Sequence, residues 1–160
     1  MHEIPNQALA KSNTHLLRYW PVYWQKLLPL SELLVRIYLA SVFFKSGMTK
    51  ISNWSVTLEL FTDEYHVPLL SPALAAYSAT AGELIFPVLL VFGLARHFAS
   101  LGLFILNMVA VISYYHVLQD MPAAIEQHKL WGMLLLILSL LPTHYLCLDF
   151  YLRKSAVIKP

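Results

Sequence analysis

Three basic residues, Arg36, Lys45 and Lys50, stand inside a long apolar stretch from Leu33 to Ile51. A charged side chain at membrane depth is costly and usually marks a function, so each of these residues calls for a partner or a role. At 3.6 residues per turn, one helical face holds five residues: Glu32, Arg36, Phe43, Gly47 and Lys50. Lys45 points elsewhere. Lys50, near the end of the stretch, can extend its ammonium group to the membrane surface.

We expect the charge of Arg36 to be neutralised by Glu83. At a rise of ~1.5 Å per residue, Arg36 lies roughly 12 Å inside a span that starts near Leu28, and Glu83 roughly 16 Å inside one that ends near Leu94. Glu32, one turn before Arg36, is the competing partner, but it lies nearer the interface, where water can hydrate it. The sequence leaves open whether the pair only fixes helix register or also handles a ligand or a proton.

Other polar residues are predicted at similar depth or towards the outer surface. Counted in the same way, Asn107 and Ser139 lie roughly 14–16 Å deep, where amide and hydroxyl groups often serve as packing contacts between helices. His116 and His128 flank the last connection, but two histidines without a carboxylate or cysteine at ligand spacing make a poor metal site, so we predict no metal. The predicted buried polar or ligand-binding cluster has six members: Arg36, Glu83, Asn107, Ser139, Lys45 and His116.

Motifs of soluble enzymes are not found in the sequence. It contains no glycine-rich phosphate loop, no HExxH and no G-x-S-x-G pattern. Cys147 is the single cysteine, which excludes an internal disulfide and a CxxC redox pair. We expect Cys147 to be inert, since apolar surroundings raise the pKa of a thiol.

These residues require an all-α, polytopic membrane fold to position them. Spans of roughly 20 residues and short connections use most of the chain, so we predict an antiparallel bundle of four transmembrane helices. The expected spans are about 28–50, 69–94, 98–118 and 128–150. Aromatic and aliphatic residues recur at helical spacing over 54–65, with acidic and hydroxyl residues between them. This pattern predicts a short amphipathic helix that lies on the membrane surface or caps the bundle.

The division of the chain follows from this pattern. Residues 1–26 are predicted to be an N-terminal segment anchored at the interface by aromatic and basic side chains, 27–152 the transmembrane domain and 153–160 a tail. No cleavage site for a signal peptide follows an apolar core, so the first span is expected to direct insertion.

Composition and charge placement agree with a membrane location. The chain is 58% hydrophobic and only 12% charged, and its formal net charge of +2 gives no support for nucleic-acid binding. Lysine and arginine gather in both terminal segments and at Arg96, whereas the other two connections are mainly acidic. The positive-inside rule therefore predicts that both termini are cytoplasmic.

The first span resembles a motif of the DoxX family of small bacterial membrane proteins. That motif has an arginine, a Leu-Gly pair, a phenylalanine, a small residue with glycine, and a lysine followed by leucine. The residues that match it are Arg36, Leu39, Phe43, Ser46, Gly47 and Lys50. Ala40 and Ile51 replace the first glycine and the final leucine. Glu83 resembles the glutamate of the family's second helix, and Cys147-Leu148-Asp149 resembles its closing Ser-Leu-Asp.

The resemblance implies a four-helix protein of the bacterial inner membrane that is associated with redox systems. Some relatives are subunits of thiosulfate–quinone oxidoreductases or quinol oxidases. We therefore expect an accessory or docking subunit that binds a small amphipathic ligand or a membrane or periplasmic redox partner. No cofactor-ligating set is evident, and quinone is the cofactor that the resemblance leaves open. A catalytic quinone-reactive subunit and a small transporter are the alternatives, and a homo-oligomer also stays open.

Overall fold

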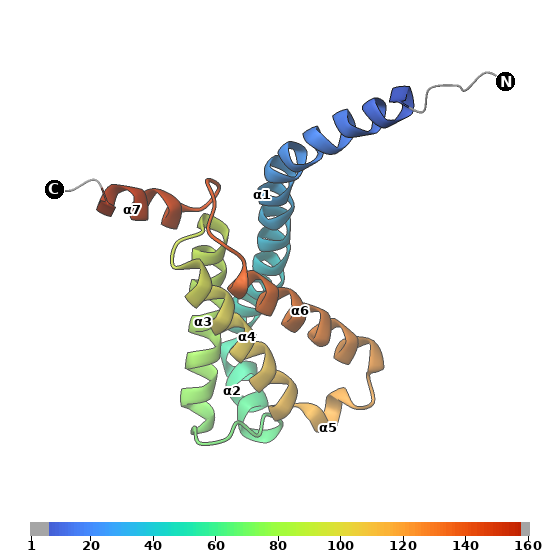
Figure 1. Cartoon of the computed structure of the whole chain (residues 1–160). Helices are drawn as coiled ribbons and strands as arrows, with labels where there is room; N and C mark the ends of the chain where they lie inside the picture. Colours follow the sequence, from blue (N-terminus) through green and yellow to red (C-terminus); the bar gives the residue numbers. More distant parts are fainter. Residues whose placement is uncertain (1–6, 158–160) are drawn as a thin grey trace.

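The computed structural model describes residues 7–157 and the side chains of 27–156 (Figure 1). Within these residues the chain is helical and has no strand. Its helices are α1 (Gln7–Ser52), α2 (Trp54–Asp63), α3 (Pro72–Phe92), α4 (Arg96–Ser113), α5 (Tyr115–Leu118), α6 (Pro122–Leu140) and α7 (Leu148–Val157). The aromatic and basic side chains predicted to anchor the first 26 residues lie outside the described side chains.

Four of the helices pack next to one another in chain order. Helix α3 packs between α1 and α4, and α4 packs against α6, which also contacts α1. Helix α2 lies against α3 at the far end of the bundle from α7. Helix α7 leaves the bundle where α3 passes into α4, and it runs across the axis of α3 (Figure 1).

Three helical segments are long and apolar enough to cross a membrane: Leu27–Ser52, Pro72–Phe92 and Arg96–Ser113. Helix α6 packs on α4 but does not meet the same criterion; Glu126 and Lys129 stand in its first turns. The all-helical membrane architecture is therefore confirmed, whereas the fourth span and the four-helix transmembrane count stay predictions.

Local signals set the helix ends. Ser71 precedes α3 and its hydroxyl accepts a hydrogen bond from the Leu74 amide at 3.4 Å, while Gly93 ends the helix with a φ of 63° that favours glycine. Helix α4 ends at Ser113, so the predicted span to residue 118 is too long. The predicted continuation of the last span to residue 150 is also wrong: α6 ends at Leu140, because the residue before Pro142 is forced into an extended conformation.

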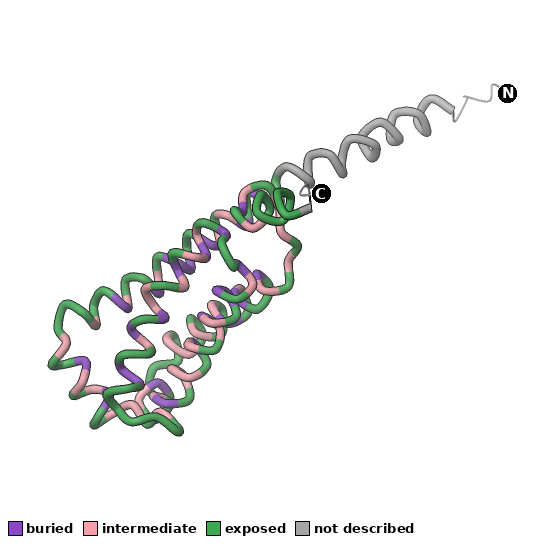
Figure 2. Tube along the Cα trace, turned by 90° about the vertical axis from the view of Figure 1, so that its left-hand side faces the viewer, coloured by how far each residue is buried: buried purple, intermediate pink, exposed green. Residues whose placement is uncertain are grey.

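Two apolar clusters hold the bundle together. The larger one includes Leu39, Leu90, Leu103 and Leu135 from α1, α3, α4 and α6. The smaller one joins Phe61 of α2 to Ala75 and Ala76 of α3, which confirms a helix near residues 54–65, although its position at a membrane surface is untested. Buried positions recur between exposed ones along the long helices (Figure 2). Many exposed positions are large apolar side chains, as expected of helices that face lipid.

Candidate functional site

The predicted ion pair between Arg36 and Glu83 is wrong. Glu83 instead receives hydrogen bonds from Lys50, whose Nζ lies 2.9 and 2.6 Å from the two carboxylate oxygens. Arg36 donates to the backbone carbonyls of Leu146 at 2.9 Å and Leu90 at 3.4 Å, close to the end of α3. The depth estimate failed because α1 does not start near Leu28 but continues past the end of α3. Arg36 is therefore level with the last turn of α3 rather than with its middle.

The Lys50–Glu83 pair lies at one side of a cavity of about 250 Å³ between α2, α3 and α4. Lys50 also donates to the Ser46 hydroxyl at 2.9 Å, so its ammonium group is held by two partners on α1 and α3. Most of the cavity wall is apolar and includes Ile105, Leu106 and Val109 of α4. The arrangement combines an apolar space with a proton donor and a carboxylate.

Three hydroxyl-bearing residues also line the cavity: Tyr65, Ser78 and Ser113, of which Ser78 donates to the Leu74 carbonyl of its own helix. Ser113 is 2% exposed, and its Oγ has no hydrogen-bond partner among the described residues. Tyr65 stacks between Phe61 and Tyr114, with both ring centroids 4.6 Å away. Burial, with the nearby Tyr114, Glu83 and Glu64 charges, raises the pKa of Tyr65 to about 12, so its phenol stays protonated at neutral pH. A buried hydroxyl without a partner is costly, and a bound acceptor would satisfy Ser113.

A second buried cluster lies at the other end of the bundle, where Glu32 binds two arginines and a histidine. Arg96 donates to one oxygen of Glu32, and His144 Nε2 lies 2.6 Å from the other. Arg36 Nε is 3.8 Å from the first oxygen. Both arginines are fully buried and Glu32 is 4% exposed. Glu32, which the depth estimate had set aside, is thus the acid that faces Arg36.

The chain after α6 completes this second cluster. The carboxylate of Asp149 accepts hydrogen bonds from the backbone amides of Ala95 and Arg96, both at 2.9 Å, at the N-terminus of α4. Leu146 contributes its carbonyl to Arg36 and Leu141 contributes its carbonyl to Arg96. The segment therefore locks α1, α3 and α4 together at this end.

Three potential metal ligands meet here as well. Donor atoms of Glu32, His144 and Cys147 all lie within 4.8 Å of one another. Such donor types suit zinc. However, both oxygens of Glu32 already have partners, and the guanidinium groups of Arg36 and Arg96 beside it would repel a divalent cation. The geometry fits an ion-pair lock better than a metal centre.

The remaining predicted site residues lie apart from both clusters. Asn107 is buried and bonds His128, donating to its carbonyl at 3.0 Å and facing its Nδ1 at 2.8 Å, so it links α4 to α6. The Ser139 hydroxyl bonds only within its own helix. Lys45 and His116 are exposed. The structure thus does not gather the six predicted residues into one site.

Sequence reasoning missed several residues that the structure brings into the two clusters. Tyr65 lay at the end of an expected helix and Ser113 within an expected span, and neither position carried a signal for burial. Arg96 was assigned to a connection and His144 to the interior of a span. The one available signal for Glu32 was its place on the same helical face as Arg36 and Lys50, which is the buried face of α1.

The fold and these clusters indicate the class of protein: an all-helical, multi-pass membrane protein with ionisable groups buried between its helices. The sequence model of the DoxX family matches residues 31–116. Because this match covers more than half of the chain, the protein belongs to the DoxX family. The matched region contains every residue that lines the Lys50–Glu83 cavity, but not His144 or Asp149.

A curated relative is similar over part of the chain. It is an uncharacterized protein of Haemophilus influenzae, 39% identical over 89 residues, which amount to 53% of this chain and 57% of the relative. The match thus spans little more than half the length of that relative. No solved structure matches the chain significantly.

Proposed function

We propose that this DoxX-family membrane protein is an accessory subunit of a quinone-linked redox system and binds a quinone head group in the Lys50–Glu83 cavity. The observation that carries the proposal is the combination of apolar walls, a partly buried ion pair and the unpartnered hydroxyl of Ser113 in one cavity. Apolar pockets with a few convergent polar groups are the usual binding sites for small ligands.

The chemistry of the cavity suits a quinone ring. The two carbonyl oxygens of a quinone accept hydrogen bonds, which the Lys50 ammonium and the hydroxyls of Ser113 and Tyr65 can supply. The apolar residues of α4 would pack on the ring faces. The cavity volume of about 250 Å³ is below the ~300–1,000 Å³ of pockets for drug-sized ligands. We therefore propose that only the quinone ring enters the cavity and that the isoprenoid tail stays among the lipids.

The predicted placement in the membrane is part of the proposal. In the bacterial inner membrane with cytoplasmic termini, the end that carries α2 would face the periplasm, and the cavity would open in the outer half of the bilayer. A redox partner in the membrane or periplasm would then act next to the bound quinone.

A catalytic subunit is the second candidate function, and the position of Glu83 favours it. A carboxylate beside the bound ring could accept a proton from a quinol, with Lys50 compensating the charge. In an accessory subunit, replacement of Glu83 by Gln would weaken binding only modestly. In a catalytic subunit it would abolish quinol oxidation while the quinone stays bound. The transporter alternative loses its proposed gate, because Arg36 and Glu83 do not meet.

The binding test is a titration of the protein in lipid nanodiscs with a short-chain ubiquinone or menaquinone analogue, followed by quenching of tryptophan fluorescence. Trp54 packs against α3 near the cavity. Ser113→Ala removes one donor, and we expect it to weaken binding about fivefold, the effect of one neutral hydrogen bond. Lys45→Met, on the exposed side of the same α1, is the control and should bind as the unmodified protein does. Absence of saturable binding in the unmodified protein would overturn the proposal.

A further inference from the structure

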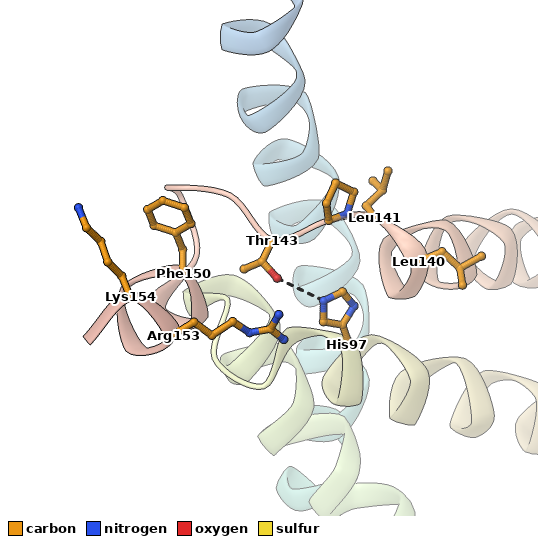
Figure 3. A pocket seen from close by; sticks show the side chains of 8 residues that line it. His97, Leu140, Leu141, Thr143, Phe150, Arg153 and Lys154 are labelled. Carbon is orange, nitrogen blue, oxygen red and sulfur yellow. Dashed lines mark hydrogen bonds between the residues drawn. The ribbon is translucent and has the colours of Figure 1, made fainter. Parts of the chain in front are cut away.

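A groove of about 770 Å³ lies at the opposite end of the bundle, between α7, the start of α4 and the segment that follows α6 (Figure 3). Its polar lining comes from His97, Thr143, Arg153 and Lys154. It shares no lining residue with the Lys50–Glu83 cavity. It adjoins the Glu32 cluster, because Arg96 donates to the Leu141 carbonyl and its Nη2 lies 3.3 Å from His97 Nε2.

The groove carries positive charge that no described carboxylate neutralises. Arg153 and Lys154 form no ion pair within the described residues, and the adjacent Asp149 is occupied at the N-terminus of α4. The guanidinium of Arg153 extends towards His97 and Thr143, whereas the Lys154 ammonium points away from them towards the rim (Figure 3).

Both ring nitrogens of His97 have hydrogen-bond partners at the groove. Its Nδ1 lies 2.8 Å from the Ser139 carbonyl, which makes Nδ1 the protonated nitrogen. Nε2 is then the acceptor that faces the Thr143 hydroxyl at 3.3 Å. The arginine and lysine side chains that line the groove are Arg153 and Lys154.

The other side of the groove is apolar. Leu140 is 77% exposed, and it lines the groove together with Leu141 and Phe150. On α7 itself, Tyr151 and Leu152 are also exposed. A helix with exposed apolar side chains and cations that crosses the end of membrane-spanning helices is typical of one that lies at the lipid–water interface.

We propose that this groove binds an anionic phospholipid, with its phosphodiester held by Arg153 and its acyl chain along Leu140 and Phe150. Lys154 at the rim would attract the headgroup. A free phosphate would use only the cations, and the apolar wall would have no role. The predicted cytoplasmic location of this end agrees with the proposal, because polybasic segments there are attracted to anionic lipids.

The test measures which lipids remain bound to the purified full-length protein by native mass spectrometry, after exchange into equal amounts of phosphatidylglycerol and phosphatidylcholine. We expect the unmodified protein to retain phosphatidylglycerol about 10–30-fold more, as two cations near a phosphate imply. Arg153→Gln with Lys154→Gln should reduce the preference to about twofold or less. The control, Lys45→Gln with Lys129→Gln, removes the same charge from exposed positions elsewhere and should keep the preference.

Two soluble competitors distinguish a lipid phosphate from a free phosphate as the ligand of the groove. Neither inorganic phosphate nor glycerol phosphate at millimolar concentration should displace phosphatidylglycerol, and Leu140→Ser should weaken lipid retention without removing a cation. Displacement by inorganic phosphate would show a free-anion site and overturn the proposal. An equal preference in the charge variant and its control would overturn it as well. Quinone titration of the same variants should be unchanged, so this result is independent of the proposed function.

Discussion

The two charge clusters between the helices of this protein differ in what surrounds them. At one end, Glu32 uses both carboxylate oxygens on Arg96 and His144, and Arg36 is held by backbone carbonyls. At the other end, Lys50 and Glu83 border a cavity that also contains the unpartnered hydroxyl of Ser113. Buried charges that satisfy one another fix the positions of helices, whereas charges beside an apolar space can bind a ligand. We therefore assign stability to the first cluster and ligand binding to the second.

The largest effect is expected from Glu32→Ala, which leaves two buried guanidinium groups without their carboxylate. Breaking a buried ion pair from one side costs roughly 3–5 kcal/mol, so the protein should fall sharply in abundance and melting temperature. The measurement is fluorescence-detected size exclusion of a fusion protein after heating. Glu126→Ala, which removes the exposed partner of Lys129, should leave the melting profile unchanged. A normal profile for Glu32→Ala would show that the cluster is not a lock.

An intermediate effect on stability is expected at the Lys50–Glu83 pair. Lys50→Met strands Glu83, which is only partly exposed, and should cost roughly 1–3 kcal/mol. Adding Glu83→Gln removes the stranded charge and should restore most of the melting temperature, but not quinone binding. If the double variant regained both properties, the pair would be structural, and the contrast between the clusters would disappear.

The smallest effect on stability is expected at Asp149, at the start of α7. Asp149→Ala removes the carboxylate that accepts from the amides of Ala95 and Arg96, and it should cost about 1 kcal/mol, as loss of an N-terminal cap does. The readout is a small fall in melting temperature with quinone binding unchanged. Loss of quinone affinity in this variant would mean that the two ends of the bundle are coupled.

Much of the fold follows from apolar run lengths, but the contacts between helices do not. Hydropathy predicts the α1, α3 and α4 spans, and spacing predicts the shared buried face of Glu32, Arg36 and Lys50. The ion-pair partners of the residues on that face depend on how far α1 extends beyond the end of α3. The length of an apolar run does not determine this offset between helices. Glu32 was therefore set aside in favour of Glu83.

The Glu32 cluster also depends on a reversal of the chain after α6, which the apolar run of the sequence does not indicate. The apolar run of α6 continues past Pro142, so His144 and Cys147 looked like parts of a span. The proline ends the helix and returns the chain to Glu32 and Arg36. Ser113 was likewise missed, because a serine at a helix end gives no sign that a cavity lies beside it.

Filling the cavity without touching its polar groups tests the central claim most directly. Ala79 of α3 lines the cavity, and Ala79→Phe should occupy the space of the quinone ring, while Ala81→Phe places the same side chain at an exposed position of the same helix. Quinone extracted per mole of protein purified from its native membrane is the quantity to measure. The account predicts quinone in the unmodified protein and in Ala81→Phe, and little or none in folded Ala79→Phe. Equal quinone content in the two phenylalanine variants, or none in the unmodified protein, would contradict it.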